Sequence, residues 1–144
     1  MPDPAQAPSE GLKADSRLKT ALESVATTVS RKRGATLFSE GDPVDAVYLV
    51  IRGKISLSVR TEGGIVELTA AGPDYVLGLP AALANRCYSL TAQVVQNAEL
   101  LVIPQQKALD VLRQDPQLCF RVVQMLSDEV RHLRRVIAHP LPVS

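Results

Sequence analysis

The stretch GATLFSEGDPVDAVYLVIRGKI, residues 34–55, decides the fold of this chain. In it, short runs of β-branched and aromatic residues alternate with breaks that contain glycine. Runs of this kind, bounded by Gly, Pro and Asp, are typical of strands and turns. We expect Gly41, Gly53 and Gly72 to lie in turns with positive φ, where any other side chain would be strained.

The same pattern extends on both sides of this stretch. Strands about ten residues apart along the chain indicate an antiparallel barrel, roll or sandwich. Gly63-Gly64 lies between KISLSVRT and IVELT and predicts a hairpin. The strand-like runs are ATTVS, TLF, AVYLVI, KISLSV, IVELT, LTAQVV and ELLVI.

Helical patterns occur only at the two ends of the chain. Apolar residues recur at helical spacing from Leu18, behind Asp15 or Ser16 as a suitable N-cap. After Pro104 a short helix is expected, and Asp115-Pro116 starts a longer one. The expected organisation is a disordered tail over 1–15, a domain over 16–138 with a β-roll at 26–104 and C-terminal helices at 105–138, and a second tail over 139–144.

The long C-terminal helix carries a heptad seam. Its apolar positions are spaced 4, 3, 4, 3 and 4 residues apart, and β-branched residues at a with leucine at d favour a parallel two-stranded coil. Glu129 and Arg134 occupy g and e positions, as an interchain pair requires. A second apolar stripe, beginning at Leu118, would pack on the roll. We therefore expect a homodimer through the 116–138 helix, the alternative being a monomer whose seam faces its own core. The seam consists of Cys119, Val123, Leu126, Val130, Leu133 and Ile137.

Composition excludes several classes of function. The chain has 144 residues, 46% of them apolar, and a formal net charge of +1, which is typical of one globular domain. Neutral charge and 3% aromatic residues argue against whole-surface attraction to nucleic acid and against base-stacking platforms. No apolar run approaches the length of a membrane span, and residues 1–16 lack the basic start and the apolar stretch of a signal peptide. We therefore expect a cytoplasmic protein without membrane contact.

The chain has few residues of the kinds that bind metal ions or carry out catalysis. Cys87 and Cys119 are too few for a cysteine-only zinc or iron–sulfur site. The histidines, His132 and His139, lie on or beyond the long helix, so no strand carries histidine ligands. We therefore expect no catalytic residues, no metal and no required cofactor.

The segment 34–55 resembles the cyclic-nucleotide-binding domain, in particular the sensor half of Crp/Fnr-type bacterial regulators. The resemblance covers about residues 16–138. It implies an eight-stranded antiparallel β-roll, jelly-roll-like, with a short N-terminal helix and a long C-terminal helix that pairs in a dimer. The matching positions are Gly34, Leu37-Phe38, Glu40-Gly41-Asp42, Asp45, Tyr48, Val50 and Gly53.

The resemblance also implies a phosphate-binding cassette, in which a Gly-Glu pair opens a short helix and an Arg-Ser/Thr pair follows. The Glu accepts the ribose hydroxyl and the Arg neutralises the cyclic phosphate. Here Gly78 matches, but Leu79 replaces the Glu and Tyr88 replaces the Arg, while Ser89 fits the last position. Loss of two charged hydrogen bonds, at roughly 1.5–3 kcal/mol each, should lower the affinity for cyclic AMP or cyclic GMP by a factor of about 10²–10⁴.

The sequence leaves open whether this segment still binds an anion. The amides behind Pro80 at the start of a helix, hydroxyl groups, or Arg86 on a shifted loop would supply it. Leu79 and Tyr88 either line a pocket for another ligand or fill it; an open pocket favours a receptor and a filled one an interaction module. The candidate ligand residues are Gly78, Leu79, Pro80, Ala81, Ala82, Tyr88, Ser89 and Thr91, with Arg86 as an addition.

The sequence thus predicts a Crp/Fnr-like regulatory or sensor dimer with a degenerate cassette. The alternatives are a ligand-free dimerisation or protein-interaction module, or the sensor half of a longer transcription regulator. Such regulators continue into a helix-turn-helix that reads DNA, whereas this chain ends at Ser144, so we expect no direct DNA binding from it alone. The partner would be a small molecule or a protein that the sequence does not identify.

Overall fold

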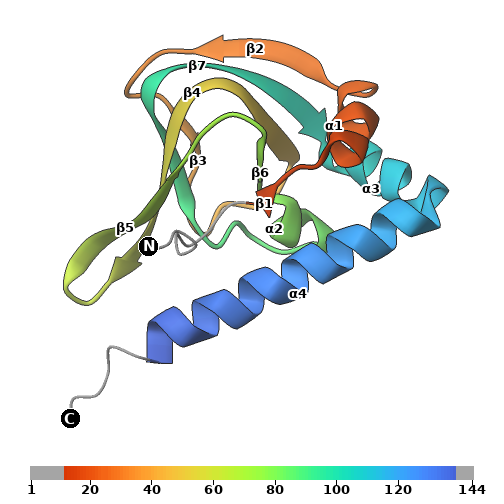
Figure 1. Cartoon of the computed structure of the whole chain (residues 1–144). Helices are drawn as coiled ribbons and strands as arrows, with labels where there is room; N and C mark the ends of the chain where they lie inside the picture. The colour runs from red at the N-terminus through yellow and green to blue at the C-terminus, as the bar shows by residue number, and fades with distance from the viewer. Residues whose placement is uncertain (1–11, 139–144) are drawn as a thin grey trace, which may run out of the picture.

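The structure of the chain is a computed structural model, which describes the backbone of residues 12–138 and the side chains of residues 13–127. A rolled sheet forms the body, and the long helix α4 runs along one side of it (Figure 1). The elements in chain order are β1 (Leu12–Lys13), α1 (Ser16–Glu23), β2 (Thr27–Arg31), β3 (Thr36–Phe38), β4 (Ala46–Thr61), β5 (Gly64–Ala71), β6 (Tyr75–Leu77), α2 (Leu79–Ala84), β7 (Thr91–Pro104), α3 (Gln105–Gln114) and α4 (Pro116–Ala138).

The strands pair in the order β1-β6-β4-β7-β2, with β3 on β7 and β5 on β4, and every pairing is antiparallel. The predicted β-roll with flanking helices is confirmed. The described residues form seven strands, so the expectation of eight was wrong. Runs expected as separate strands join into the two long strands β4 and β7, because the chain stays extended where we expected it to turn.

Gly53 is the residue that lets β4 continue. Its φ is +94°, but it lies in an irregular part of the β4–β7 pairing and not in a reverse turn. A Cβ atom at this position would lie 2.5 Å from the carbonyl oxygen of Asn97, so only glycine fits. Gly41 has the expected positive φ, at +93°, whereas Gly72 does not have one.

Two apolar clusters hold the fold together. The first, which we call the helix-side core, joins α1, α3 and α4 to the sheet through residues such as Leu18, Leu49 and Leu118. The second, the roll interior, lies inside the curved sheet. The roll interior contains Phe38, Val50, Ile55, Leu57, Ala71, Leu77, Tyr88, Ala92, Val94, Ala98 and Leu100.

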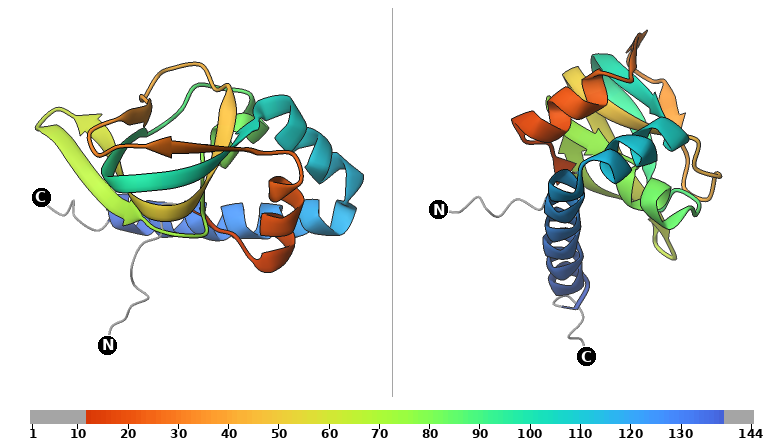
Figure 2. Two further views of the ribbon diagram at one scale, coloured as in Figure 1. Left: turned by 90° about the horizontal axis from the view of Figure 1, so that it is seen from above. Right: turned by 90° about the vertical axis from the view of Figure 1, so that its right-hand side faces the viewer.

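Two aspartates tie the helices to one another. Asp15 caps α1 by accepting the N–H of Leu18 at 3.0 Å, which confirms the predicted N-cap, and it also pairs with Arg121 of α4. The Leu18 hydrogen bond and the Arg121 guanidinium hold the pKa of Asp15 below its usual range. Asp115 binds Arg17 at 2.8 Å, and this guanidinium lowers the pKa of Asp115. Figure 2 shows how closely α1 approaches the α3–α4 junction that these pairs connect.

The domain starts earlier in the chain than expected. Leu12 and Lys13 pair with β6, and Ala14 is buried, so these residues belong to the folded unit although the sequence analysis assigned them to the tail. The rest of the expected tails, over 1–11 and 139–144, lies outside the described residues.

Candidate functional site

The segment expected to form the cassette comprises β6, α2 and the loop before β7. Gly78, with φ +86°, starts α2, and Pro80 lies in its first turn as predicted. Leu79 has 0% exposure and packs in the helix-side core. The N–H of Ala82 donates to the carbonyl of Gly78 at 3.0 Å, so this amide does not provide the anion contact that the sequence analysis left open.

Tyr88, at the position expected for the family's arginine, is 3% exposed and points into the roll interior. Its ring stacks on Phe38 with centroids 4.0 Å apart and planes 15° apart. Its hydroxyl accepts from the backbone N–H groups of Asp45 at 3.2 Å and Ala46 at 3.1 Å. The same hydroxyl has two acceptors in reach, the Ala46 carbonyl at 2.7 Å and the Asp45 carboxylate at 2.9 Å. Burial raises the pKa of Tyr88 to about 12.

Close packing around the Tyr88 ring explains the glycine that precedes α2. A Cβ atom on Gly78 would lie 3.1 Å from the Tyr88 ring and 3.3 Å from the Ala46 carbonyl oxygen. Because a phenol has one donor and two acceptor sites, the contacts to Asp45 and Ala46 use its full capacity. The space beside Gly78 is therefore filled by the chain's own aromatic ring.

The structure does not bring the other candidate residues together around that space. Ser89 and Arg86 are exposed, and Ala81 is half-buried. The hydroxyl of Thr91 accepts the N–H of Glu40 at 2.9 Å. Successive strand residues face opposite sides of a sheet, so Thr91 faces away from its buried neighbour Ala92 and from the roll interior.

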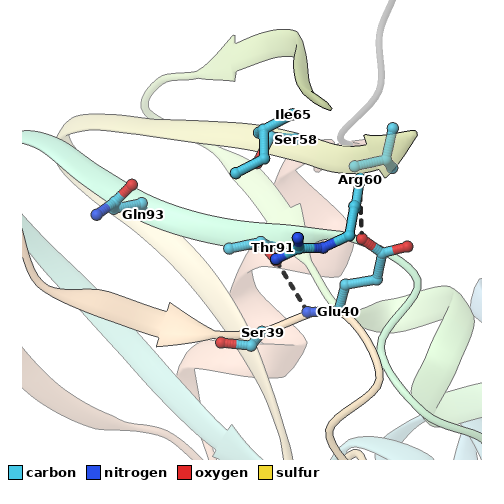
Figure 3. Close-up of a pocket in the computed structure, with 8 residues that line it drawn as sticks. Ser39, Glu40, Ser58, Arg60, Ile65, Thr91 and Gln93 are labelled. Carbon is cyan, nitrogen blue, oxygen red and sulfur yellow. Dashed lines mark hydrogen bonds between the residues drawn. The ribbon is translucent and has the colours of Figure 1, made fainter. Parts of the chain in front are cut away.

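On that opposite face Thr91 contributes to a cavity that the sequence analysis did not predict. Its volume is about 590 Å³, and its walls come from the two residues that follow β3, from β4, from β5 and from β7. Figure 3 shows Arg60, Thr91 and Glu40 gathered at one end and Gln93 at the other. A carboxylate oxygen of Glu40 accepts the backbone N–H of Arg60 at 2.9 Å. The sequence signal for this cavity is the presence of polar residues at alternate positions of β4 and β7. An ordinary solvated strand face has the same pattern, so the signal does not identify a cavity.

In the first half of the long helix α4, some apolar residues pack on the roll and others are exposed. Leu118 and Val122 are each 1% exposed and pack in the helix-side core, so the second stripe is confirmed to contact the roll. Val123 is 50% exposed, and Phe120, which the heptad count did not include, is 63% exposed. Cys119 and Leu126 are partly buried. The side chains of Glu129, Val130, Leu133, Arg134 and Ile137 lie outside the described residues.

Two searches among the described residues bear on other kinds of site. No group of three or more His, Cys, Asp or Glu side chains there is arranged to hold a metal ion. No helix in the same part of the chain combines the length and the apolar character that crossing a membrane requires. Cys87 and Cys119 are free thiols.

Comparison with known proteins agrees with the fold and with the segment 34–55. The model of the cyclic nucleotide-binding domain matches residues 28–115. Patatin-like phospholipase domain-containing protein 6 of Pongo abelii is 26% identical over 112 residues, covering 77% of this chain and 8% of the relative. Transcriptional activator protein anr of Pseudomonas aeruginosa is 28% identical over 101 residues, covering 69% of this chain and 41% of the relative. The chain thus spans less than half the length of either relative. The crystal structure of the Thermus thermophilus catabolite activator protein matches with a TM-score of 0.76 at 26% identity, covering 86% of this chain and 58% of that one.

Proposed function

Because the chain belongs to the cyclic nucleotide-binding domain family, we propose that it is a Crp/Fnr-type regulatory domain that works as a homodimer and does not respond to cyclic AMP or cyclic GMP. In this proposal its own side chains close the standard nucleotide site. Signalling then depends on contacts with proteins or with a different ligand. The name of the relative anr describes transcription activation, and this chain covers 41% of that relative.

The observation that carries the proposal is the environment of Tyr88. A nucleotide entering beside Gly78 would have to separate the Tyr88 and Phe38 rings and break the hydroxyl contacts to Ala46. Leu79, buried in the helix-side core, offers no acceptor for a ribose hydroxyl. Entry would therefore cost packing and hydrogen bonds without supplying a charge for the phosphate.

A thermal-shift titration tests the nucleotide part of the proposal. Cyclic AMP, cyclic GMP and inorganic phosphate are each added up to millimolar concentration. A ligand that binds only the folded state adds about 1.4 kcal/mol to the free energy of unfolding at tenfold saturation, which is readily detected as a shift in Tm. We expect no shift with either nucleotide. A clear shift at micromolar cyclic AMP would refute the closed site.

An exposed apolar surface on α4 supports the dimer. Phe120 and Val123 expose apolar surface on α4, next to a stripe that already packs on the roll. Helices with apolar residues on two faces need two partners, and a second copy of α4 fits the heptad spacing. Sedimentation should therefore show a dimer for the unmodified chain and a monomer for Val123→Glu. The matched control is Gln124→Glu, which adds the same charge at an exposed position off the seam. A monomeric unmodified chain, or dimers with both variants, would contradict this seam.

The filled interior favours the interaction module over the receptor. Tyr88 needs no ligand to satisfy its hydroxyl, so the roll is complete without one. If the module form is right, amide hydrogen exchange in α2 and at the start of β7 should be the same with and without cyclic nucleotide. Added protection there on nucleotide addition would favour the receptor.

A further inference from the structure

The cavity on the outer face of the roll has the size and hydrogen-bonding groups of a small-molecule site. Its volume of about 590 Å³ lies within the range of roughly 300–1,000 Å³ that ligand sites occupy. Hydroxyl groups of Ser39, Ser58 and Thr91 line it. Because the Thr91 oxygen accepts from Glu40, its own proton remains free to donate. The cavity therefore presents donors and acceptors that the chain does not use up.

Two opposite charges meet at one end of this cavity. A carboxylate oxygen of Glu40 is held there by the Arg60 backbone N–H, and in Figure 3 both side chains lie beside Thr91. Among the described residues no ion pair joins the Arg60 guanidinium to any carboxylate. A ligand carrying one charge would satisfy one of these groups and be repelled by the other. A ligand carrying both charges satisfies both.

The strand geometry sets the length of such a ligand. Thr91 and Gln93 are two residues apart on β7 and face the same side, which places them roughly 7 Å apart. The amide of Gln93 lies at the end of the cavity away from the charges (Figure 3). Ile65, the partner of Arg60 in the β4–β5 pairing, supplies an aliphatic wall.

From these features we propose that the cavity binds a zwitterionic small molecule of the α-amino acid class, with a polar side chain about as long as that of glutamine. Its carboxylate contacts Arg60, its ammonium contacts Glu40, and its side chain reaches Gln93. This site lies on the face of the sheet opposite Tyr88 and does not depend on the proposed function, so either can fail while the other holds.

Calorimetric titration with matched probes tests the proposal. L-glutamine carries all three groups, glutaramate lacks only the ammonium, and γ-aminobutyramide lacks only the carboxylate. Each analogue loses a charged hydrogen bond, so we expect it to bind about 10- to 100-fold more weakly than L-glutamine. Glycine, which is too short to reach Gln93, should also bind more weakly. Absence of L-glutamine binding at millimolar concentration, or equal binding of glutaramate, would overturn the proposal.

Variants in the full chain assign the binding to this cavity. Glu40→Gln keeps an oxygen that accepts from the Arg60 backbone and removes only the charge, and Arg60→Gln removes the guanidinium. Both should weaken L-glutamine binding about 10- to 100-fold. The matched control is Lys54→Gln, which removes an exposed positive charge on β4 outside the cavity and should leave binding unchanged. Loss of binding in the control, or none in Glu40→Gln and Arg60→Gln, would place the site elsewhere.

Discussion

Replacing Tyr88 by phenylalanine removes one oxygen atom from the roll interior and leaves the ring in place. In the native chain that oxygen contacts the N–H and the carbonyl of Ala46, a residue that is 6% exposed. In Tyr88→Phe the buried Ala46 N–H loses this acceptor and water does not reach it. The variant therefore isolates the hydrogen bonds from the packing.

The expected loss in the free energy of unfolding is about 1–3 kcal/mol, the usual cost of leaving a buried polar group without a partner. Tyr88→Ala also removes the ring that stacks on Phe38, and it should cost about 3–5 kcal/mol. The difference between the two variants measures how much of the stability comes from filling the space.

Urea unfolding followed by circular dichroism measures these losses at a fixed protein concentration. The matched control is Tyr75→Phe, because Tyr75 is half-buried and its hydroxyl forms no hydrogen bond within the described part of the chain. We expect the control to change stability by less than about 0.5 kcal/mol. If Tyr88→Phe and Tyr75→Phe are equally stable, the hydroxyl does not hold the interior closed.

Three further results are expected. Gly53→Ala should lose about 2–4 kcal/mol in urea unfolding, because its Cβ would lie 2.5 Å from a backbone oxygen at positive φ. Gly63→Ala, whose Cβ would meet the Thr61 hydroxyl at an ordinary 3.9 Å, should change the free energy of unfolding little. Arg17 lowers the pKa of Asp115 below 3.8, so on acidification the unfolded state takes up a proton at this carboxylate before the folded state does. The free energy of unfolding should therefore fall as pH drops below about 4, and this fall should be shallower in Asp115→Asn. Because burial raises the pKa of Tyr88 to about 12, its protonated hydroxyl contributes stability that is fully present below about pH 10 and is lost as pH rises through 12. Ultraviolet titration should show a tyrosine that ionises near pH 12, and this component should disappear in Tyr88→Phe.

Local patterns were sufficient to predict the helices and the roll. Asp15 before Leu18 identified the start of α1, and Asp115-Pro116 identified the start of α4, because capping depends on residues close in sequence. β-branched runs predicted the sheet, and the Gly63-Gly64 hairpin joins β4 to β5 as expected. The predicted break between two strands at Gly53 was wrong, since glycine at positive φ occurs in bulges as well as in turns.

The filled site around Tyr88 and the outer cavity could not be predicted from the sequence, because each is formed by residues that are far apart along the chain. Tyr88 was identified as a replacement for a charged residue, but whether it lined or filled the site depended on Phe38 and Ala46, which are more than forty positions away in the sequence. The outer cavity collects Glu40, Arg60 and Gln93 from three segments. Arg60 and Gln93 lie in segments with the ordinary polar alternation of a solvated strand, and Glu40 lies in a polar turn, so no local signal marks the site.

The closed nucleotide site is the central claim, and a site-resolved titration tests it most directly. Cyclic AMP is added to the isotopically labelled chain up to millimolar concentration while NMR follows the backbone amides of residues 78–92. The account predicts that these amides do not move, because Tyr88 and Phe38 stay stacked and hydrogen-bonded within the chain. Saturable shifts at Gly78 and Tyr88 with micromolar cyclic AMP would contradict it and identify the chain as a cyclic nucleotide receptor.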